Sequence, residues 1–234
     1  MAFHYSPKIV TNGLVLALDG ANKKSYPGSG TTWTDLSGNG NTGTLVNGVG
    51  FDGGNGGSIV FDGVNDYISL DRSTTYDFTN NQSFTISGWF NITQVDGSCP
   101  YVGKWGTNSN STGGYQLWVG SGLGNNRVAF SVANGGATAA TTALMTYTFG
   151  VWNYFVGVYH ANTKLECYLN DTGYQTVSYT SPINNPAVNF KIGKADYGTQ
   201  TFTGKSSSVL LYNKALSSQE ILQNYNATKG RFGL

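Results

Sequence analysis

Alternation of apolar and polar residues with a period of two runs through much of the chain. The clearest case is Ser83–Ile92, where Phe84, Ile86, Phe90 and Ile92 fall on one side. Arg127–Ala133 repeats the pattern over a shorter run, with every second residue large and apolar. A period of two places alternate side chains on opposite faces of an extended strand, so these stretches predict half-buried β-strands.

Two segments have the pattern of hairpins. In GSIVFDGVNDYISL, residues 57–70, the apolar runs Ile59–Phe61 and Tyr67–Leu70 flank the turn-forming residues DGVND. In the second, Val151–Tyr159 and Lys164–Leu169 flank the loop HANT. Strand-forming residues on both sides of Gly, Asn and Asp are a hairpin signal.

Shorter strands are expected at Gly13–Leu18, Tyr101–Trp105, Tyr115–Gly120, Tyr174–Tyr179, Phe190–Gly193 and Ser208–Tyr212. By contrast, Asp35–Leu45 consists almost entirely of turn-forming residues and predicts a loop.

One helix is predicted near the carboxyl end. Ser217 and Glu220 have the spacing of a capping box. Ile221, Leu222 and Tyr225 follow as an apolar stripe at helical spacing, and Gly230 closes the segment.

About a dozen short strands, with a turn signal every ~8–12 residues, are typical of a β-sandwich. The sequence therefore predicts an all-β protein, built as two antiparallel sheets with one short C-terminal helix. No linker-like composition interrupts the strands, so we expect residues 1–234 to form a single domain. Residues 1–12 would be an N-terminal arm, and 217–234 a C-terminal helix and tail.

The charge content argues against several classes of partner. Charged residues make up 11% of the 234 residues, against about 25% in a typical soluble protein, and the net charge is +1. No basic stripe indicates nucleic acid. The longest apolar runs, such as Leu14–Leu18, are too short to span a bilayer, so we expect no membrane insertion.

The first residues, MAFHYSPKIVTNG, contain no apolar run of signal-peptide length. The wealth of Gly, Asn, Thr and Tyr is nevertheless of the extracellular type. Release by cell lysis within a virus particle reconciles the two observations, and another export route would also fit.

The two cysteines, Cys99 and Cys167, lack the spacing of a metal or redox motif. Cys167 alternates with Leu165 and Leu169, which predicts a buried thiol. A disulfide between the two cysteines is left open.

Few residues suit catalysis. Most glycosidases need two carboxylates about 5–10 Å apart, and the chain has only Glu166, in a predicted strand, and Glu220, in the capping box, as glutamates. The only histidines are His4 and His160. We therefore expect no enzymatic activity.

Oxygen-bearing side chains gather in two turn-rich segments: Asp35, Asn39, Asp62 and Asp66. Ca²⁺ takes six to eight oxygen ligands from such loops, so a structural calcium ion is one interpretation. The alternative is that these residues form Asx turns. No other cofactor is expected.

Aromatic and amide side chains are interleaved between Val95 and Arg127. Aromatic faces stack on sugars and amides bind hydroxyl groups, so this mixture predicts a glycan site. The candidate contacts are Tyr101, Trp105, Asn108, Tyr115 and Trp118. Gly, Asn and Ser surround Trp105 and Trp118, which makes these two the better candidates. The alternative is that the rings belong to the core.

Five segments in order resemble the laminin-G-like group of the concanavalin A-like lectin/glucanase superfamily: DLSGNGNTGTL, SIVFDGVNDYISL, SFTISGWFNI, VWNYFVGVYHANTKLECYLND and FTGKSSSVLLYNKALSSQEI. The resemblance covers residues 13–226 and implies a jelly-roll sandwich. Two features depart from it. Glucanases of this fold carry a Glu-x-Asp-x-Glu run, which is absent here. Relatives often have an Asp-Glu pair after Phe-x-Gly, where this chain has Lys205 and three serines.

Both ends, HYSPKIVTNGLVLALDGANKKSYPGSGTTW and LYNKALSSQEILQNYNATKGRFGL, resemble laminin-G-like proteins of tailed-phage particles. This resemblance implies a non-enzymatic structural protein of the virion: a capsid decoration, an appendage or a fibre-associated protein. Its partners would be other virion proteins in a multi-copy assembly and, secondarily, host-surface glycans. A carbohydrate-binding, lectin-like adhesin is the alternative, and a divergent glycan-active enzyme comes last.

Overall fold

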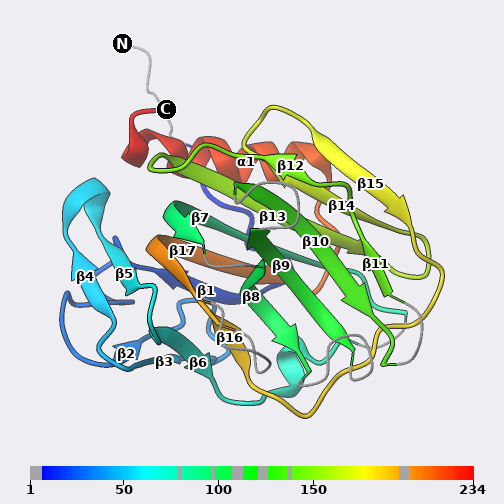
Figure 1. Ribbon diagram of the computed structural model, residues 1–234, viewed down its shortest axis with the longest axis horizontal. Coiled ribbons are helices and arrows are strands. Elements are labelled where there is room, and N and C mark those ends of the chain that lie inside the picture. Colours follow the sequence, from blue (N-terminus) through cyan, green and yellow to red (C-terminus); the bar gives the residue numbers. More distant parts are fainter. Residues whose placement is uncertain are drawn as a thin grey trace.

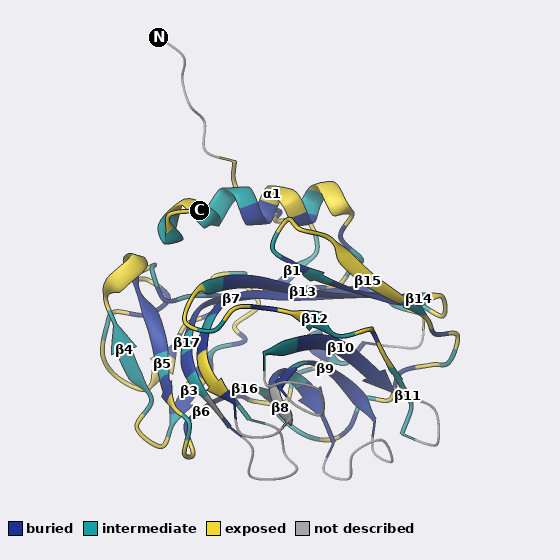
Figure 2. Ribbon diagram, turned by 45° about the horizontal axis from the view of Figure 1, so that its top comes forward, coloured by how far each residue is buried: buried dark blue, intermediate teal, exposed yellow. Residues whose placement is uncertain are grey.

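Two antiparallel sheets pack face to face, and helix α1 (Ser218–Thr228) lies on the outer side of one of them (Figures 1 and 2). The computed structural model describes residues 7–78, 81–95, 98–106, 113–120, 126–135, 139–194 and 201–234, with the backbone alone for 98–100 and 202. The predicted all-β sandwich with one short C-terminal helix is confirmed. Within the described residues, no helix has the length and apolar character needed to cross a membrane.

Sheet A, the sheet beneath α1, has the strand order β15-β14-β13-β7-β17-β5-β4, and β1 also pairs with β17. Its strands are β1 (Leu14–Asp19), β4 (Gly50–Asp52), β5 (Ser58–Asp62), β7 (Phe84–Val95), β13 (Trp152–His160), β14 (Lys164–Leu169), β15 (Tyr174–Ser178) and β17 (Phe202–Tyr212).

Sheet B forms the opposite layer, in the order β11-β10-β9-β8-β16-β6-β3-β2, with β12 also paired to β10. Its strands are β2 (Thr32–Trp33), β3 (Gly43–Val46), β6 (Tyr67–Leu70), β8 (Ser98–Trp105), β9 (Gly114–Gly120), β10 (Arg127–Ala133), β11 (Ala139–Thr141), β12 (Met145–Thr146) and β16 (Phe190–Ile192). Short 3-10 turns are η1 (Gly54–Gly56), η2 (Thr74–Tyr76) and η4 (Lys229–Phe232).

The turn DGVND joins the two sheets rather than closing a hairpin. β5 pairs with β4 and β17 in sheet A, whereas β6 pairs with β3 and β16 in sheet B. The prediction of a hairpin at residues 57–70 is therefore wrong, although both strands exist. A turn of Gly, Asn and Asp bends the chain equally well toward the same sheet or the facing one, because the choice of pairing partner is made by distant strands.

The core between the sheets follows the predicted alternation. The apolar face of β7, from Phe84 to Ile92, is fully buried there, and so are Val128, Phe130 and Val132 of β10. Cys167 lies in the same core as a free thiol, so it does not pair with Cys99. The burial predicted for Cys167 is confirmed.

Three local predictions need correction. Gly43–Val46, which the loop prediction for Asp35–Leu45 overlaps, forms β3. β17 begins at Phe202 rather than Ser208, because Ser206 and Ser207 are small enough to be fully buried within the strand. On α1, Leu222 is 45% exposed and its place in the buried face is taken by Asn224.

Helix α1 begins as predicted. The Ser217 side chain accepts from Glu220 N, and the Glu220 carboxylate accepts from Ser217 N. This reciprocal capping satisfies two backbone N–H groups that the helix itself leaves unpaired. The capping box therefore sets where the helix starts against sheet A.

The outer face of sheet A is closed by α1 and the segment that follows it. Trp89 of β7 stacks on Tyr225 with ring centroids 5.4 Å apart and contacts Phe232 at 4.4 Å. Its Nε1 donates to Thr228 Oγ1 at 2.7 Å. These contacts form a second apolar cluster outside the sandwich, which also includes Tyr154. The outer face of sheet A around Trp89 is therefore covered by α1 and the segment that follows it.

Candidate functional site

One row of small and polar residues crosses the outer face of sheet B. Each strand from β3 to β11 contributes one residue to it, and cross-strand register joins each residue to the next. The residues of this polar row, in order across the sheet, are Thr44, Ser69, Lys191, Gly103, Gln116, Ser131 and Thr141. Their immediate neighbours, such as Tyr115 and Leu117, belong to the core, so the row faces away from it.

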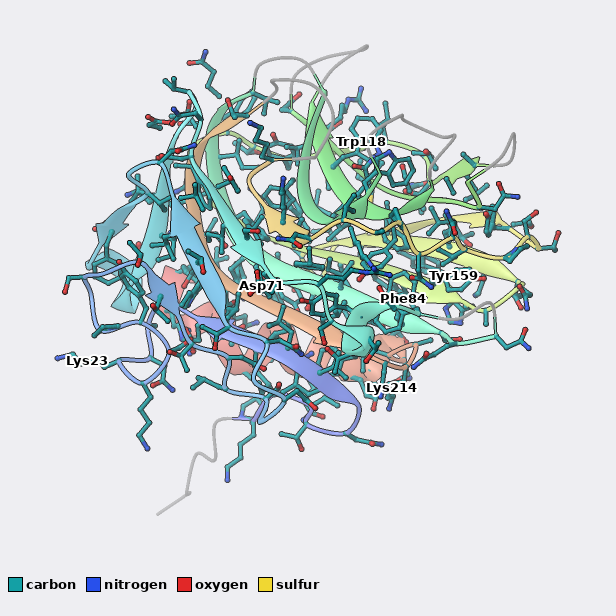
Figure 3. All side chains as sticks on the ribbon, turned by 90° about the horizontal axis from the view of Figure 1, so that it is seen from below. Lys23, Asp71, Phe84, Trp118, Tyr159 and Lys214 are labelled. Carbon is teal, nitrogen blue, oxygen red and sulfur yellow. The ribbon has the colours of Figure 1, made fainter. Side chains whose placement is uncertain are left out.

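Trp118 stands beside the row on β9. Its Nε1 donates to Ser131 Oγ at 2.7 Å, and Ser131 Oγ and Thr141 Oγ1 are 2.7 Å apart. Opposite Trp118 on β10 is Ala129, whose side chain is too small to cover the indole. Figure 3 shows Trp118 on the opposite side of the molecule from Lys214, the residue that precedes α1 by a few positions. The hydrogen bonds fix the indole edge while the ring remains partly exposed.

Among the residues that the structure describes on this face, Gln116 Oε1 and Trp105 Nε1 have no hydrogen-bond partner. Both side chains are only 6% exposed. Gln116 is opposite Gly103, and Trp105 follows Gly103 by two residues, so the two side chains are neighbours on one face. Buried polar atoms are nearly always bonded in folded proteins. The outer side of the sheet therefore holds an unpaired acceptor beside an unpaired donor, both just beneath the surface.

Positive charge lies at the third residue of the row, Lys191, and at the nearby Lys194. Lys191 Nζ is 5.2 Å and Lys194 Nζ 5.6 Å from the centre of the Tyr67 ring. A cation held over an aromatic face is stabilised by the ring's quadrupole. Tyr67 thus has its ring engaged by ammonium groups, which distinguishes it from Trp118.

The structure divides the predicted glycan contacts. Tyr101 and Tyr115 are fully buried between the sheets, where Tyr101 contacts the Phe90 ring at 3.9 Å and Tyr115 OH donates to Tyr76 O at 2.9 Å. A sugar cannot reach either ring, so these two candidates are corrected to core residues.

Trp105 and Trp118 lie on the outer face of sheet B, and their contact with a glycan stays a prediction. Asn108 lies outside the described residues. Sequence reasoning missed Gln116 and Ser131, although a signal existed. Each lies between two inward apolar residues, so the period-two phase of its strand points it outward.

Asp35 holds a loop against the edge of β1. Its Oδ1 accepts from Ala17 N and Ser37 N, and its Oδ2 accepts from Ser37 Oγ and Asn41 N, all at 2.7–3.0 Å. Asn39 Nδ2 donates to a β1 carbonyl, the Leu14 oxygen, at 3.4 Å. At Asp35 and Asn39 the side chains therefore hydrogen-bond to the chain around the loop, as the Asx-turn alternative to calcium binding predicts.

Asp62 and Asp66 lie in the turn between the sheets. Asp62 Oδ1 accepts from Val64 N at 2.8 Å, and Asp66 Oδ2 accepts from Asp62 N at 3.0 Å. Asp66 is 4% exposed, and its Oδ1 has no partner. Burial, together with the nearby Asp62 charge, raises the pKa of the Asp66 carboxyl.

In the described chain, no three acidic, histidine or cysteine side chains are grouped to hold one ion. Asp35 therefore does not join Asp62 and Asp66 in a single site. Calcium at the Asp62–Asp66 turn stays a prediction.

The two glutamates serve separate structures. Glu166 lies on the outer face of sheet A, where its carboxylate meets Lys164 Nζ at 2.6 Å, His160 Nε2 at 3.0 Å and Tyr168 OH at 3.0 Å. Burial raises the pKa of Glu166, but the hydrogen bonds from these three groups outweigh it and hold the pKa below its usual value. Glu220 caps α1. Neither belongs to the polar row, and the absence of enzymatic activity stays a prediction.

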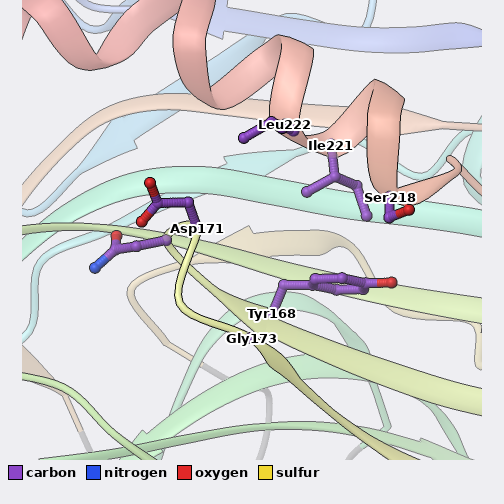
Figure 4. Close-up of a pocket in the computed structure, with 7 residues that line it drawn as sticks. Tyr168, Asp171, Gly173, Ser218, Ile221 and Leu222 are labelled. Atoms are coloured by element: carbon purple, nitrogen blue, oxygen red, sulfur yellow. The ribbon is translucent and has the colours of Figure 1, made fainter.

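A small pocket of about 200 Å³ lies between α1 and the β14–β15 turn (Figure 4). It is lined by Tyr168, Asn170, Asp171, Gly173, Ser218, Ile221 and Leu222. Ligand pockets are usually about 300–1,000 Å³, so this pocket is too small to hold an oligosaccharide.

The architecture is similar to that of several solved binding domains. The botulinum neurotoxin serotype G binding domain has a TM-score of 0.72 at 13% identity, over 91% of this chain and 50% of that one. The serotype D ligand-binding domain in complex with N-acetylneuraminic acid gives 0.72 at 11% identity, over 92% and 51%. Domain 4 of the arabinanase AbnA from Geobacillus stearothermophilus, in complex with arabinotriose, gives 0.67 at 16% identity, over 91% and 98%. At such identities the likeness shows the fold alone.

The chain spans about half the length of the toxin binding domains it matches. No curated protein matches it in sequence. A family profile described as the concanavalin A-like lectin/glucanases superfamily, Laminin_G_3, matches residues 62–222, which is more than half of the chain. The chain therefore belongs to this laminin-G-like family of the concanavalin A-like lectin/glucanase superfamily.

Proposed function

We propose that this protein is a carbohydrate-binding, lectin-like domain whose ligand lies along the polar row of sheet B. The observation that carries the proposal is the pairing of unused hydrogen-bonding atoms, Gln116 Oε1 and Trp105 Nε1, with the partly exposed indole of Trp118. Sugars present hydroxyl groups that donate and accept, and apolar faces that stack on aromatic rings. Both chemistries meet on this face.

The length of the row favours a chain of sugars over a single one. Seven strands contribute to it, and neighbouring strands are ~4.8 Å apart, so the row runs for ~29 Å. Two of the similar structures were solved with sugars, N-acetylneuraminic acid and arabinotriose. These sugars define the first ligands to test.

The test is a glycan array with the purified protein, with and without calcium, followed by calorimetric titration of the best ligands. Gln116→Ala and Trp118→Ala should each weaken binding at least tenfold, which corresponds to about 1.4 kcal/mol. Val151→Ala, an exposed change just before β13, is the matched control and should leave affinity unchanged. The proposal fails if no glycan binds, or if binding survives both changes on sheet B.

The second candidate function is a structural role in a tailed-phage virion. It is supported by the resemblance of both chain ends to laminin-G-like phage proteins, and by the low charge content of 11%. Mass spectrometry and electron microscopy of purified particles would test it. Many ordered copies on the particle are expected, and a protein recovered only outside particles would contradict the role.

A further inference from the structure

The free edges of the two sheets differ in how they are protected. An unpaired strand edge can pair with another chain, and proteins usually block it with a loop, a charge or a very short strand. The edge of β1 is blocked by the 35–41 loop: Leu36 N donates to Ala17 O, and Asn41 Nδ2 donates to Val15 O. The edge strand β4 has three residues and ends at Asp52, which is paired with Lys205.

The described edge strands of sheet B are short as well. β2 has two residues, β11 three and β12 two. A strand of two or three residues offers too few backbone groups to hold another chain by itself. Of the described edges, this leaves β15.

β15 lacks these protections. Its five residues, YQTVS, include no charge and no proline, and their register with β14 is continuous, without a bulge. Four of the five are exposed, and Figure 2 shows the strand in yellow along almost its whole length. It is an uncharged, regular edge of normal strand length.

Hydrogen bonds at both ends of the β14–β15 pairing show which way the backbone of β15 points. Leu169 N donates to Gly173 O at 3.4 Å, and Tyr179 N donates to Thr163 O at 3.0 Å. In an antiparallel pair, residues bonded to the neighbouring strand alternate with residues that are not. The odd-numbered residues of β15 therefore bond to β14.

The even-numbered residues then present their N–H and C=O groups to the free edge. These residues are Tyr174, Thr176 and Ser178. No other described backbone group bonds to them from that side. Three donors and three acceptors at alternate positions make a complete antiparallel pairing edge.

We propose that β15 is a self-association edge, through which two copies of this protein pair antiparallel across a twofold axis at Thr176. Thr176 then lies opposite the partner's Thr176, and Tyr174 lies opposite the partner's Ser178. Each of the three pairs exchanges two hydrogen bonds, about six in all. A second copy fits because the uncharged strand places no like charges opposite each other, and a Thr–Thr pair is favourable.

Apolar side chains beside the strand add contact area. Tyr174 is 51% exposed and stacks on Tyr168 at 4.9 Å, and Leu222 of α1 is 45% exposed on the far side of the small pocket in Figure 4. One five-residue strand and these side chains are at the low end of interface size. The dimer is therefore expected to be weak and reversible, and because it forms at the edge of sheet A it leaves both polar rows uncovered.

Sedimentation velocity over a hundredfold range of protein concentration tests this arrangement. The unaltered protein should shift from monomer to dimer as concentration rises. Thr176→Lys places two ammonium groups opposite each other at the axis and should weaken association at least tenfold. Thr176→Pro removes an outward N–H that β14 does not use, and should do the same. Ser29→Lys, in the exposed loop after β1, is the charge-matched control and should behave as the unaltered protein.

Hydrogen exchange provides the second readout, and circular dichroism checks that each variant is folded. The amides of Tyr174, Thr176 and Ser178 should become protected as concentration rises, while those of β4 should not change. The proposal is overturned if the unaltered protein stays monomeric at the highest concentration. It is equally overturned if folded Thr176→Lys and Thr176→Pro still dimerise, or if a dimer forms without protection of these three amides.

Discussion

The outer faces of the two sheets have the same backbone geometry but different coverings: α1 packs on sheet A, and no described helix packs on sheet B. On sheet A, the outward residues Trp89, Tyr154 and Val156 are buried beneath α1, in a cluster separate from the sandwich core. On sheet B, the outward residues Gln116 and Ser131 are also nearly buried, at 6% and 4% exposed, but they are polar and no described helix lies over them. The comparison teaches that a sheet face becomes structure or surface according to what the rest of the chain lays on it.

The largest expected effect comes from opening the covered face. Trp89→Ala removes an indole that stacks on Tyr225 and Phe232 and bonds to Thr228, so we expect a loss of about 3–5 kcal/mol of unfolding free energy. Urea denaturation measures it. Trp118→Ala, the matched change on sheet B, should cost less than half as much because its ring is partly exposed. Equal losses would contradict the difference between the two faces.

A buried amide ties the helix to the chain start and to sheet A. Asn224 Oδ1 accepts from Val10 N at 2.8 Å, and its Nδ2 donates to Tyr212 OH at 3.0 Å. Asn224→Ala leaves the Val10 N–H buried without this partner and should destabilise the protein by about 1–3 kcal/mol. The control is Asn226→Ala, which removes the same kind of side chain two residues later in α1, where it is only partly buried. Thermal denaturation separates them, and similar melting temperatures would refute the role given to Asn224.

The turn that joins the two sheets should respond to pH through Asp66. Its folded-state pKa is raised above 3.8, so the native state binds more protons than the unfolded state at pH values above 3.8 and up to that raised pKa. Stability should therefore fall as pH rises through this window. Asp66→Asn should remove this slope in denaturation measured from pH 4 to 7. A slope unchanged in the variant would show that another group is responsible.

Calcium bound at the same turn would offset the loss of stability caused by ionisation of Asp66, because Ca²⁺ neutralises the buried carboxylate. A millimolar excess of calcium should raise the melting temperature of the unaltered protein by a few degrees, and a chelator should reverse the shift. Asp66→Asn should abolish the response, while Asp35→Asn should retain it. If neither calcium nor the chelator changes the melting temperature, the prediction of a calcium site is wrong.

The smallest effect on stability is expected on the polar row. Gln116→Ala removes an oxygen that has no partner in the fold, so its cost should be below about 1 kcal/mol. Its glycan affinity should nonetheless fall at least tenfold. A large loss of stability with unchanged affinity would reverse the assignment of Gln116 from ligand contact to structural residue.

The prediction of local elements from sequence was largely accurate for strands with strong alternation. β7, β10 and β13 lie where the period of two places them, and the capping box of α1 begins at Ser217. The short strand Gly43–Val46 was not predicted, because it contains too few apolar residues to show a period of two. The predicted start of β17 came too late for a similar reason: its first half contains buried serines, which a pattern of hydrophobic residues does not reveal.

The candidate site was predicted only in part. Trp118 is on the outer face, whereas Tyr115, three residues earlier on the same strand, is in the core. An odd separation along a strand puts two residues on opposite faces, so they could not have shared one ligand. Along β9 the same rule places Tyr115 in the core and Gln116 on the outer face with Trp118.

The sequence by itself determined where extended and helical segments form, because period and capping are local properties of neighbouring residues. It also determined that each strand has two distinct faces. Only the tertiary structure decided that DGVND crosses between sheets, that α1 closes sheet A, and that Asp35 pins a loop to β1. The reason is physical: a period of two distinguishes the faces of a strand without saying which neighbour each face will meet. That choice depends on contacts between residues far apart in the chain, such as Trp89 with Thr228.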